Sequence, residues 1–425
     1  MKKLFISILT VIIMAGCGES PGTVSSLEAD PGNAGLLLPE GFSALLVADS
    51  LGAGRHITVK ENGDIYVSLR RLKDGKGGVA LRDTSGDGKA DLIRYFGELT
   101  GTGIELHNGY LYYGADSMVV RYAFNSPENL LPEEAYEVIA GGLVDERQHA
   151  AKPFEFDGEG NMYVTIGAPS NACMEQMRTK GSPGMDPCPI LDYAGGIWRF
   201  SERVVGQDQA RDGHRYATGI RHAVALRWND RVGKLYAVQH GRDQLSQFYP
   251  EMFDEQQNAD LPAEEFLLID EGADFGWPYC YYDGLQEKKV LAPEYGGDGM
   301  KSGRCDATTD PVMAFPAHIA PNDLVFYHQE QFPGQYRNGA FIAFHGSWNR
   351  APMPQEGYNV IFVPFEDALP SGDWSVFADG FAGRDQVDNP GDAVYRPCGL
   401  AVGPDGSLYV VDSRAGRVWR IFYTG

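Results

Sequence analysis

Three segments of the sequence place a histidine or an arginine directly before a stretch that is predicted to be a strand. His149 precedes one such stretch, Arg221 and His222 precede a second, and Arg396 precedes a third. An imidazole titrates near neutral pH, so His149 is a candidate general base. The alternative is a histidine that only forms hydrogen bonds in a turn.

The two arginines stand out because the chain is acidic, with a formal net charge of −22. Arginines that converge on one site favour an anionic ligand, since the guanidinium group forms paired, charge-assisted contacts with carboxylates. The alternative is that Arg221 and Arg396 each form an ion pair with a nearby Asp or Glu. The negative charge also argues against binding to nucleic acid.

A fourth polar segment contains His240, Gly241 and Arg242, and it is followed by the neighbouring carboxylates of Glu264 and Glu265. Carboxylates beside Gly- and Pro-rich loops with free carbonyl groups favour a hard cation such as calcium, which binds oxygen ligands. The alternative for the two carboxylates is solvation at the surface.

Residues 83–91 carry carboxylates at a spacing that is similar to calcium-binding loops. The glutamate expected at the twelfth position of such a loop is absent. We therefore predict a polar hairpin turn here, with weak calcium binding at most, and do not include it in the site.

The fifth segment contains His345, Trp348 and Arg350 directly after an apolar stretch. Within six residues, these side chains offer a group that exchanges protons, an aromatic surface for stacking and a fixed positive charge. Since the adjacent polar residues would be costly to bury unpaired, we expect this segment to face a ligand. The alternative for Trp348 is packing in the interior.

A short phrase that recurs six times predicts the elements that position these residues. In each copy, a glycine is followed by apolar and aromatic residues, as expected for a tight turn that leads into a strand. The copies begin at Gly63, Gly109, Gly160, Gly233, Gly339 and Gly406. Repetition at wide, uneven intervals is typical of a propeller with insertions, so we predict an all-β, six-bladed β-propeller over residues 37–425. Residues that lead into the inner strands of a propeller face its central channel, which is the usual ligand site.

The composition is consistent with one large all-β unit. The 425 residues include 53 Gly and 25 Pro, and no Pro/Ser-rich or charged linker divides the chain after its first three dozen residues. The motifs of P-loop proteins, dinucleotide-binding folds, zinc metalloproteases and α/β-hydrolases are absent from the sequence. Cys173 with Cys188 and Cys280 with Cys305 are pairs that would each close a local loop, and Cys398 is expected to fill the core as a free thiol.

The first residues are typical of an export signal. A cationic start, an apolar run over residues 4–14 and a small-residue cleavage site before Cys17 resemble a bacterial lipoprotein signal at residues 1–16. We therefore expect a lipid anchor on Cys17, a flexible tether over residues 17–36, and a lipoprotein of the bacterial cell envelope that faces the periplasm from the outer membrane. The alternative is an ordinary secretory signal.

Taken together, the polar segments resemble one family, the pyrroloquinoline quinone (PQQ)-dependent glucose and sorbosone dehydrogenases, and most closely its sorbosone-type branch. The resemblance runs in the same order from about Leu38 to the C-terminus. It rests on the segments 39–42, 219–221, 240–243, 262–265, 276–278, 345–350 and 396–406. The resemblance implies a six-bladed propeller that uses PQQ and calcium.

The resemblance also implies roles for individual residues. His149 matches the base that takes the proton of a sugar hydroxyl while hydride passes to the quinone, and Arg221 matches the arginine beside the reacting carbonyl. Arg396 matches an arginine that binds the carboxylates of the cofactor. The main-chain carbonyls of Gly241 and Arg242 match calcium ligands. The remaining predicted site residues are Glu264 and Glu265, near a structural calcium, and, in the cofactor pocket, His222, His240, His345, Trp348 and Arg350.

Three positions differ from the glucose-oxidising members of that family. His222 stands where they have an asparagine, Cys398 where they have a second arginine, and Ala168 where they have an aspartate that supports the base. Their cofactor-binding lysine has no clear counterpart in this sequence.

The function implied is oxidation of an aldose or sorbosone-like sugar, at a CH–OH or aldehyde group, with electrons passed to a separate acceptor such as a cytochrome or a quinone. Membrane contact is expected through the lipid anchor only. A calcium-dependent lactonase with a propeller fold is one alternative, and it should present convergent Glu, Asn and Asp ligands. A non-catalytic binding propeller is the other, and it would need none of the polar segments.

Overall fold

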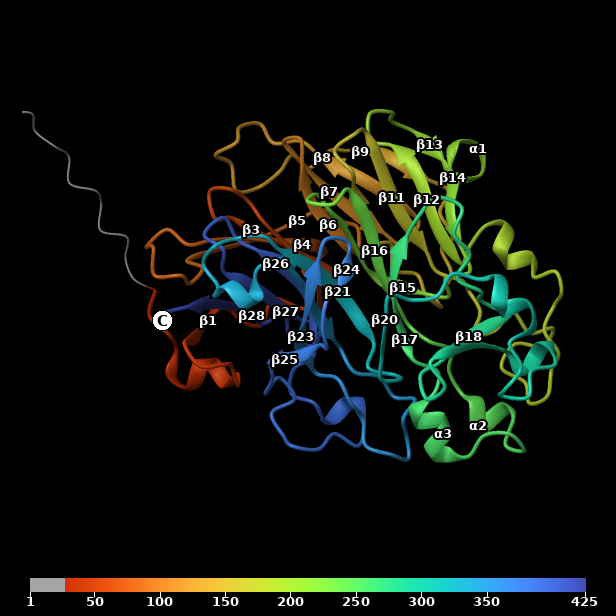
Figure 1. Ribbon diagram of the computed structural model, residues 1–425. Helices are drawn as coiled ribbons and strands as arrows, with labels where there is room; N and C mark the ends of the chain where they lie inside the picture. Colours follow the sequence, from red (N-terminus) through yellow and green to blue (C-terminus); the bar gives the residue numbers. More distant parts are fainter. Residues whose placement is uncertain (1–26) are drawn as a thin grey trace, which may run out of the picture.

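A computed structural model of the chain describes residues 27–425 (Figure 1). The predicted signal sequence and Cys17 lie outside the described residues. Six sheets, each built on four antiparallel strands, form the blades of a propeller, which confirms the predicted fold. Every inner strand contacts the inner strands of both neighbouring blades, so the ring around the central channel is closed.

The strands of each blade follow one another from the channel to the rim. The inner strands are β2 (Gly54–Val59), β6 (Gly101–His107), β10 (Phe154–Phe156), β15 (Ala223–Asn229), β21 (Pro321–Tyr327) and β26 (Pro397–Val402). The second strands are β3 (Ile65–Lys73), β7 (Tyr110–Ala115), β11 (Asn161–Ile166), β16 (Lys234–Gln239), β22 (Gly339–Phe344) and β27 (Leu408–Asp412). The third strands are β4 (Lys76–Arg82), β8 (Met118–Tyr122), β12 (Gly196–Ser201), β17 (Glu264–Ile269), β23 (Asn359–Glu366) and β28 (Val418–Tyr423). The outer strands are β5 (Leu92–Phe96), β9 (Tyr136–Gly141), β14 (His214–Thr218), β20 (Met313–Phe315), β25 (Ser375–Ala378) and β1 (Phe42–Ala48).

Short elements connect or extend the blades. The two-residue strands β13 (Gln207–Asp208) and β24 (Leu369–Pro370) pair with β9 and β23. The fourth blade carries an inserted hairpin of β18 (Cys280–Asp283) and β19 (Lys288–Leu291). The helices are α1 (Gln209–Asp212), α2 (Leu245–Phe248) and α3 (Glu255–Asp260), with 3-10 turns at Pro31–Gly35, Pro189–Asp192, Pro293–Tyr295, Gly303–Ala307, Gly334–Tyr336 and Pro390–Asp392. Among residues 27–425, no helix has the length and apolar character needed to cross a membrane.

The six recurring phrases each lead into the second strand of a blade, as predicted. Five of their six turn glycines adopt a positive φ, from 61° at Gly233 to 112° at Gly160, where a side chain would be strained. Gly339 is the exception. A Cβ at Gly339 would lie 2.1 Å from the ring of Phe362 on the neighbouring strand, so this glycine is required by close packing instead.

The two ends of the chain meet in the sixth blade. β1 pairs antiparallel with β28, and the two strands lie side by side in Figure 1. The sheet order is β1-β28-β27-β26, so the first strand of the propeller supplies the outer edge of its last blade. Hydrogen bonds between the two ends therefore close the ring.

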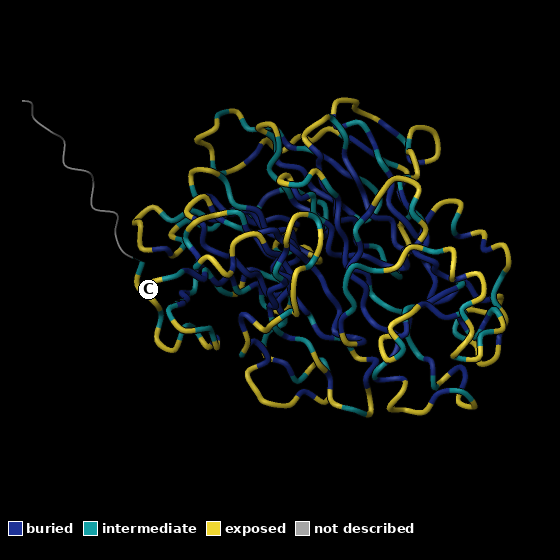
Figure 2. The backbone as a smooth tube through the Cα atoms, in the orientation of Figure 1, coloured by how far each residue is buried: buried dark blue, intermediate teal, exposed yellow. Residues whose placement is uncertain are grey.

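Apolar side chains fill the seams between neighbouring sheets, and Figure 2 shows the strands mostly buried and the loops mostly exposed. The tyrosine that recurs in the phrase has a buried ring, and its hydroxyl group forms a hydrogen bond. Tyr66 donates to the carbonyl of Leu130 at 2.8 Å, and Tyr236 donates to the carbonyl of Ala368 at 2.7 Å. Each of these residues buries a large apolar surface without leaving its polar atom unsatisfied.

A buried ionic cluster lies on the inner strands. The guanidinium of Arg227 is 2.9 Å from Glu155, 3.3 Å from Glu105 and 3.9 Å from Asp323. These four residues belong to four consecutive blades. Burial raises the pKa of Glu155 to about 8 and also raises the pKa of Glu105, because one arginine does not compensate for three carboxylates.

Part of the predicted tether packs against the propeller. The carboxylate of Asp30 accepts hydrogen bonds from the amide of Leu46 at 2.7 Å and from Lys89 at 2.6 Å. Leu36 is buried in the core beside the sixth blade. Residues 27–36 are therefore not free, and the prediction of a flexible tether over residues 17–36 is wrong for this part because these polar and apolar contacts hold it.

The structure contains both disulfides suggested by the cysteine spacing. Cys173 is bonded to Cys188 and Cys280 to Cys305, each within an insertion. Cys398 is a buried free thiol at the start of β26, as expected.

Candidate functional site

A cavity of about 480 Å³ opens at the end of the channel where the inner strands begin and the second strands end. We call it the channel cavity. Four of the predicted site residues contribute to its wall, namely His149, His222, His240 and His345. They come from the third, fourth and fifth blades, so the closed ring brings together residues that are almost 200 positions apart in the sequence. Arg147, Asp145 and Glu146 are exposed at its rim.

His149 has the geometry of a base with one free nitrogen. Its Nδ1 lies 2.5 Å from the main-chain carbonyl of Ala168, an acceptor, so Nδ1 carries the proton and Nε2 keeps its lone pair. The residue adopts a φ of 60°, a strained conformation of the kind found at functional sites. Burial, reinforced by the positive charge of Arg221, holds the pKa of His149 well below its usual value, so the ring is neutral at pH 7.

The resemblance placed Ala168 where the glucose-oxidising dehydrogenases have an aspartate that supports the base. Here the main-chain carbonyl of Ala168 takes over the task of holding the histidine ring, and its own amide donates to the carbonyl of Arg221 at 2.8 Å. The loss of a carboxylate side chain at residue 168 therefore does not leave His149 without support.

The imidazole rings of three site histidines are in contact, and two of them are stacked. His149 and His222 have ring centroids 4.4 Å apart at an interplanar angle of 18°, and His240 stands at 77° to His222 at 5.1 Å. Gly167 makes room for this stack, since a Cβ there would lie 2.7 Å from the Cβ of His149. Within residues 27–425, the buried Nδ1 of His222 has no hydrogen-bond partner.

Arg221 lies behind the histidines and does not line the channel cavity. Its guanidinium donates to the carbonyl of Gly241 at 2.9 Å, to the side-chain oxygen of Asn171 at 3.0 Å and to Asp243 at 2.8 Å. The alternative interpretation, an ion pair with a nearby carboxylate, therefore describes this arginine. Its position fits a residue that holds the loops around His149 and His240.

Arg396 also acts on a neighbouring side chain. It donates to Nδ1 of His345 at 2.9 Å and to the carbonyl of His345 at 3.1 Å. Because Nδ1 accepts this bond, Nε2 carries the proton and donates to the hydroxyl of Ser413 at 2.7 Å. His345 is thus fixed at both nitrogens, and Arg396 is not part of the cavity wall.

Two arginines that the sequence analysis did not single out line the channel cavity, Arg55 and Arg70. Arg55 stands at the start of β2 and donates only a long bond of 3.4 Å to the hydroxyl of Thr102. Within the described chain, neither arginine forms an ion pair. The positive charge of Arg55 is the main cause that lowers the pKa of Arg70, so the two cations repel one another.

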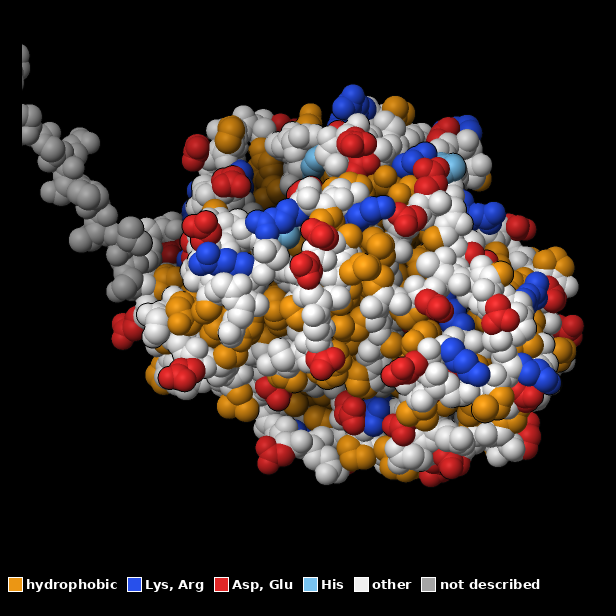
Figure 3. Space-filling view, in the orientation of Figure 1, with side chains coloured by type: hydrophobic (Ala, Val, Ile, Leu, Met, Phe, Trp, Pro, Cys, Tyr) orange, Lys and Arg blue, Asp and Glu red, His pale blue; other side chains and the backbone are white. Residues whose placement is uncertain are grey.

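This pair of arginines is unusual in a protein with a net charge of −22. Figure 3 shows acidic side chains scattered over the visible face and interspersed with Lys and Arg. Arg55 is the second residue of β2, the inner strand of the first blade, whereas Arg396 directly precedes β26, the inner strand of the sixth. An arginine at the start of a predicted inner strand is the sequence signal that identifies Arg55.

Trp348 and Arg350 lie outside the channel cavity. Trp348 is 47% exposed on the loop after β22. Arg350 is buried and donates to the carbonyl of Ala259 in α3 at 2.8 Å and to Glu356 at 2.8 Å. Arg350 therefore ties its loop to α3 and makes no contact with the cavity.

The residues predicted to hold calcium have other partners. The carbonyl of Gly241 accepts a hydrogen bond from Arg221. Glu264 accepts from the amides of Gly241 at 2.8 Å and Ala320 at 3.3 Å, and burial raises its pKa to about 8. Glu265 accepts from Gln239 at 2.8 Å and lies 3.5 Å from Lys289.

Because the carboxylates of Glu264 and Glu265 already accept these hydrogen bonds, they do not form a preassembled calcium site. Within residues 27–425, no group of three His, Cys, Asp or Glu side chains is arranged to hold a metal ion. The carbonyl of Arg242 accepts no hydrogen bond from the described residues, and that of Gly241 keeps a second lone pair.

The loop at residues 83–91 is a polar turn, as predicted. Asp83 accepts from the amides of Ser85, Gly86 and Gly88, and Asp91 accepts from those of Thr84 and Ser85. These carboxylates point at N–H donors of their own loop.

The fold and the channel cavity together define a six-bladed propeller with a histidine- and arginine-lined site on its axis. The chain belongs to the TrAA12-like family, whose model matches residues 36–424.

Curated relatives and solved structures that are similar to this chain are named as PQQ-dependent dehydrogenases. The chain is 26% identical over 282 residues to a PQQ-dependent pyranose dehydrogenase of Coprinopsis cinerea, covering 57% of this chain and 36% of that protein. It is 22% identical over 367 residues to a PQQ-dependent sugar dehydrogenase of Hypocrea jecorina, covering 80% and 79%. The holo PQQ domain of the Coprinopsis enzyme superimposes with a TM-score of 0.73 at 18% identity, over 91% of this chain and 97% of that domain. The chain spans about half or less of the full length of the first curated relatives that it matches.

Proposed function

We propose that this protein is a PQQ-dependent sugar dehydrogenase that oxidises an aldose or sorbosone-like sugar at a CH–OH or aldehyde group. The proposal rests on the residues that line the channel cavity. A histidine with a free Nε2, His149, shares one cavity with Arg55 and Arg70, two arginines that form no ion pair within residues 27–425. The names of the relatives, which are PQQ-dependent enzymes acting on sugars, support it.

The channel cavity fits the chemistry of PQQ, a planar molecule with three carboxylates. Arg55 and Arg70 supply charge-assisted donors for carboxylates, and an anion between them would also remove their mutual repulsion. The stacked rings of His149 and His222 offer a flat surface.

When bound, PQQ would supply the two-electron acceptor that the side chains of this protein lack. His149 would accept the proton of the sugar hydroxyl at Nε2, because Nδ1 is already committed to Ala168. Arg221 would act at a distance from the substrate. With Asp243 and Asn171, it holds the loops that place His149 and His240 in the wall.

The proposal also includes a calcium ion at the site. The carbonyls of Gly241 and Arg242 are the oxygen donors that remain for such an ion, which prefers oxygen ligands. Glu264 and Glu265 are not included as ligands, because their carboxylates form the structural hydrogen bonds described above. Removal of calcium with a chelator should lower dye-linked activity, and added calcium should restore it if the ion belongs to the site.

We also propose that Cys17 carries a lipid that anchors the protein in the bacterial outer membrane, facing the periplasm. The signal-like residues 1–16 support this location. The physiological electron acceptor would then be a separate cytochrome or quinone. Metabolic labelling with a fatty acid analogue should mark the wild-type protein and leave Cys17→Ser unlabelled.

The central test reconstitutes the purified protein with PQQ and calcium and follows dye-linked oxidation of a panel of aldoses and sorbosone. We expect His149→Ala to reduce the rate at least a hundredfold, since general bases contribute about 10²–10⁴-fold. His214→Ala is the matched control, because His214 is exposed on an outer strand.

The outcomes separate the alternatives. Failure of PQQ to bind on spectroscopic titration would refute the dehydrogenase assignment. PQQ binding without oxidation of any sugar would favour a non-catalytic binding propeller. Calcium-dependent hydrolysis of lactones without PQQ would favour the lactonase alternative.

A further inference from the structure

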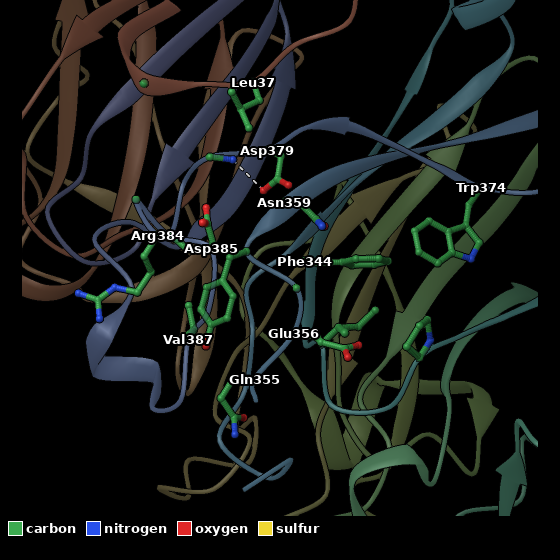
Figure 4. A pocket seen from close by; sticks show the side chains of 18 residues that line it. Leu37, Phe344, Gln355, Glu356, Asn359, Trp374, Asp379, Arg384, Asp385 and Val387 are labelled. Atoms are coloured by element: carbon green, nitrogen blue, oxygen red, sulfur yellow. Dashed lines mark hydrogen bonds between the residues drawn. The ribbon is translucent and has the colours of Figure 1, made fainter. Parts of the chain in front are cut away.

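A second cavity, of about 660 Å³, lies at the fifth blade, and none of its wall residues lines the channel cavity. We call it the blade-five cavity (Figure 4). Phe344 at the end of β22 and Asn359 at the start of β23 belong to its wall. His345, the residue after Phe344, belongs to the channel cavity. The two cavities therefore lie at the same end of the blades, separated by one segment of chain.

The wall of the blade-five cavity includes an aromatic surface. Trp374 and Phe344 have ring centroids 6.2 Å apart at an angle of 76°, and both rings are labelled in Figure 4. Trp374 is only partly buried, and its indole N–H has no hydrogen-bond partner among the described residues. A ring with an apolar face and a free donor at its edge suits a ligand with C–H faces and hydroxyl groups.

Polar atoms without partners are concentrated in the same wall. Gln355 Oε1, Tyr358 Oη and Asn359 Oδ1 are buried and form no hydrogen bond within residues 27–425. Gln355 is 5% exposed and Tyr358 is 3% exposed. An unpaired buried polar atom destabilises the protein, so a ligand that reaches these atoms with hydroxyl groups is favoured over an apolar one.

The charges of the wall favour a neutral ligand. Glu356 already pairs with Arg350 at 2.8 Å, and Asp385 is adjacent to Arg384 in the sequence. Asp379 uses one oxygen for the amide of Gly380 at 2.7 Å, the bond drawn in Figure 4, and keeps the other as an acceptor. Within the described chain, no cluster of acidic or histidine side chains is arranged for a metal ion.

We propose that the blade-five cavity is a second saccharide-binding site, which takes one unit of a neutral oligosaccharide. Trp374 and Phe344 would pack against the C–H face of the sugar ring, and Asp379, Gln355 and Asn359 would accept hydrogen bonds from its hydroxyls. This site goes beyond the oxidation proposed for the channel cavity and does not depend on PQQ.

The test uses the full chain without PQQ on an array of neutral, acidic and basic oligosaccharides, followed by calorimetry with the neutral sugars that bind. We expect Trp374→Ala to weaken binding at least tenfold and Asp379→Asn to weaken it by a smaller factor. Asp379 is exposed, so the Asn variant tests the site even where the Trp374 variant does not fold. Tyr193→Ala is the control, since Tyr193 is 42% exposed outside both cavities.

Two results would overturn the proposal. One is that no neutral oligosaccharide on the array binds, or that only basic ones do. The other is that a neutral sugar binds with equal affinity to wild type, Trp374→Ala and Asp379→Asn, which would locate it elsewhere. Either result would leave PQQ-dependent oxidation in the channel cavity unaffected, and loss of that oxidation would leave this binding test unaffected.

Discussion

Glu155→Gln should make the protein more stable at alkaline pH and leave its stability almost unchanged at pH 5. Glu155 shares Arg227 with two further carboxylates, and burial raises its pKa from 4.5 to about 8. A carboxyl whose pKa is raised on folding contributes full stability below pH 4.5 and loses it as the pH rises towards 8. Glutamine has nearly the shape of the protonated acid and carries no charge at any pH.

The magnitude follows from that pKa difference. One pKa unit corresponds to about 1.4 kcal/mol, so between pH 5 and pH 8 the wild type should lose about 3–4 kcal/mol that the variant retains. For a domain of this size, 1 kcal/mol moves the melting temperature by roughly 1–2 °C, which gives a difference of about 3–8 °C. The amide of Trp228, which donates to Glu155 at 3.3 Å, can still donate to the glutamine oxygen.

The assay is thermal unfolding of both proteins from pH 5 to pH 9. Glu330→Gln is the matched control, because Glu330 is exposed and its loss changes the net charge by the same amount. Melting curves of wild type and Glu155→Gln that stay parallel over this range would refute the reasoning. So would a wild type that is the more stable protein at pH 8.

Three further predictions concern the site and the ring. Gly167→Ala should lower kcat/KM for sugar oxidation at least tenfold, because the new Cβ would lie 2.7 Å from the Cβ and from the carbonyl oxygen of His149 and would displace this residue; unchanged kinetics would contradict this. Replacing Arg55 and Arg70 together by Met should weaken PQQ binding at least tenfold in a spectroscopic titration, and equal affinity would exclude both as ligands. Deleting residues 418–425, which include β28, should prevent folding, as judged by loss of the cooperative melt; a truncated protein that melts like wild type would disprove the role of ring closure.

The sequence predicted the architecture because one local signal repeats. A glycine turn followed by an apolar strand marks the second strand of every blade, and the number of copies is the number of blades. Even Gly339, which serves packing and not turn geometry, keeps the phrase recognisable. The tether was predicted less well, because its contacts, such as Asp30 with Leu46, depend on a surface that exists only after folding.

The candidate site was predicted in part. Because His149, His222 and Arg221 each stand before an inner strand, the sequence indicated that they lie near the channel. It did not indicate which of the three side chains faces the cavity. Arg221 turns away because Asp243 and Asn171 from two other loops surround its guanidinium. Trp348 and Arg350 were predicted to face a ligand from their residue types and their position after a strand, and the structure places both outside the channel cavity.

The pairing of β1 with β28 has a consequence for the order of events during synthesis. The channel cavity takes residues from five of the six blades, and the sixth supplies Arg396 and Ser413, which fix His345. The last strand, β28, is also the last to leave the ribosome, and β1 must wait for it with an unpaired edge. A nascent chain with five finished blades therefore has neither a closed ring nor an anchored His345, and the site is assembled only after the sixth blade has been synthesised.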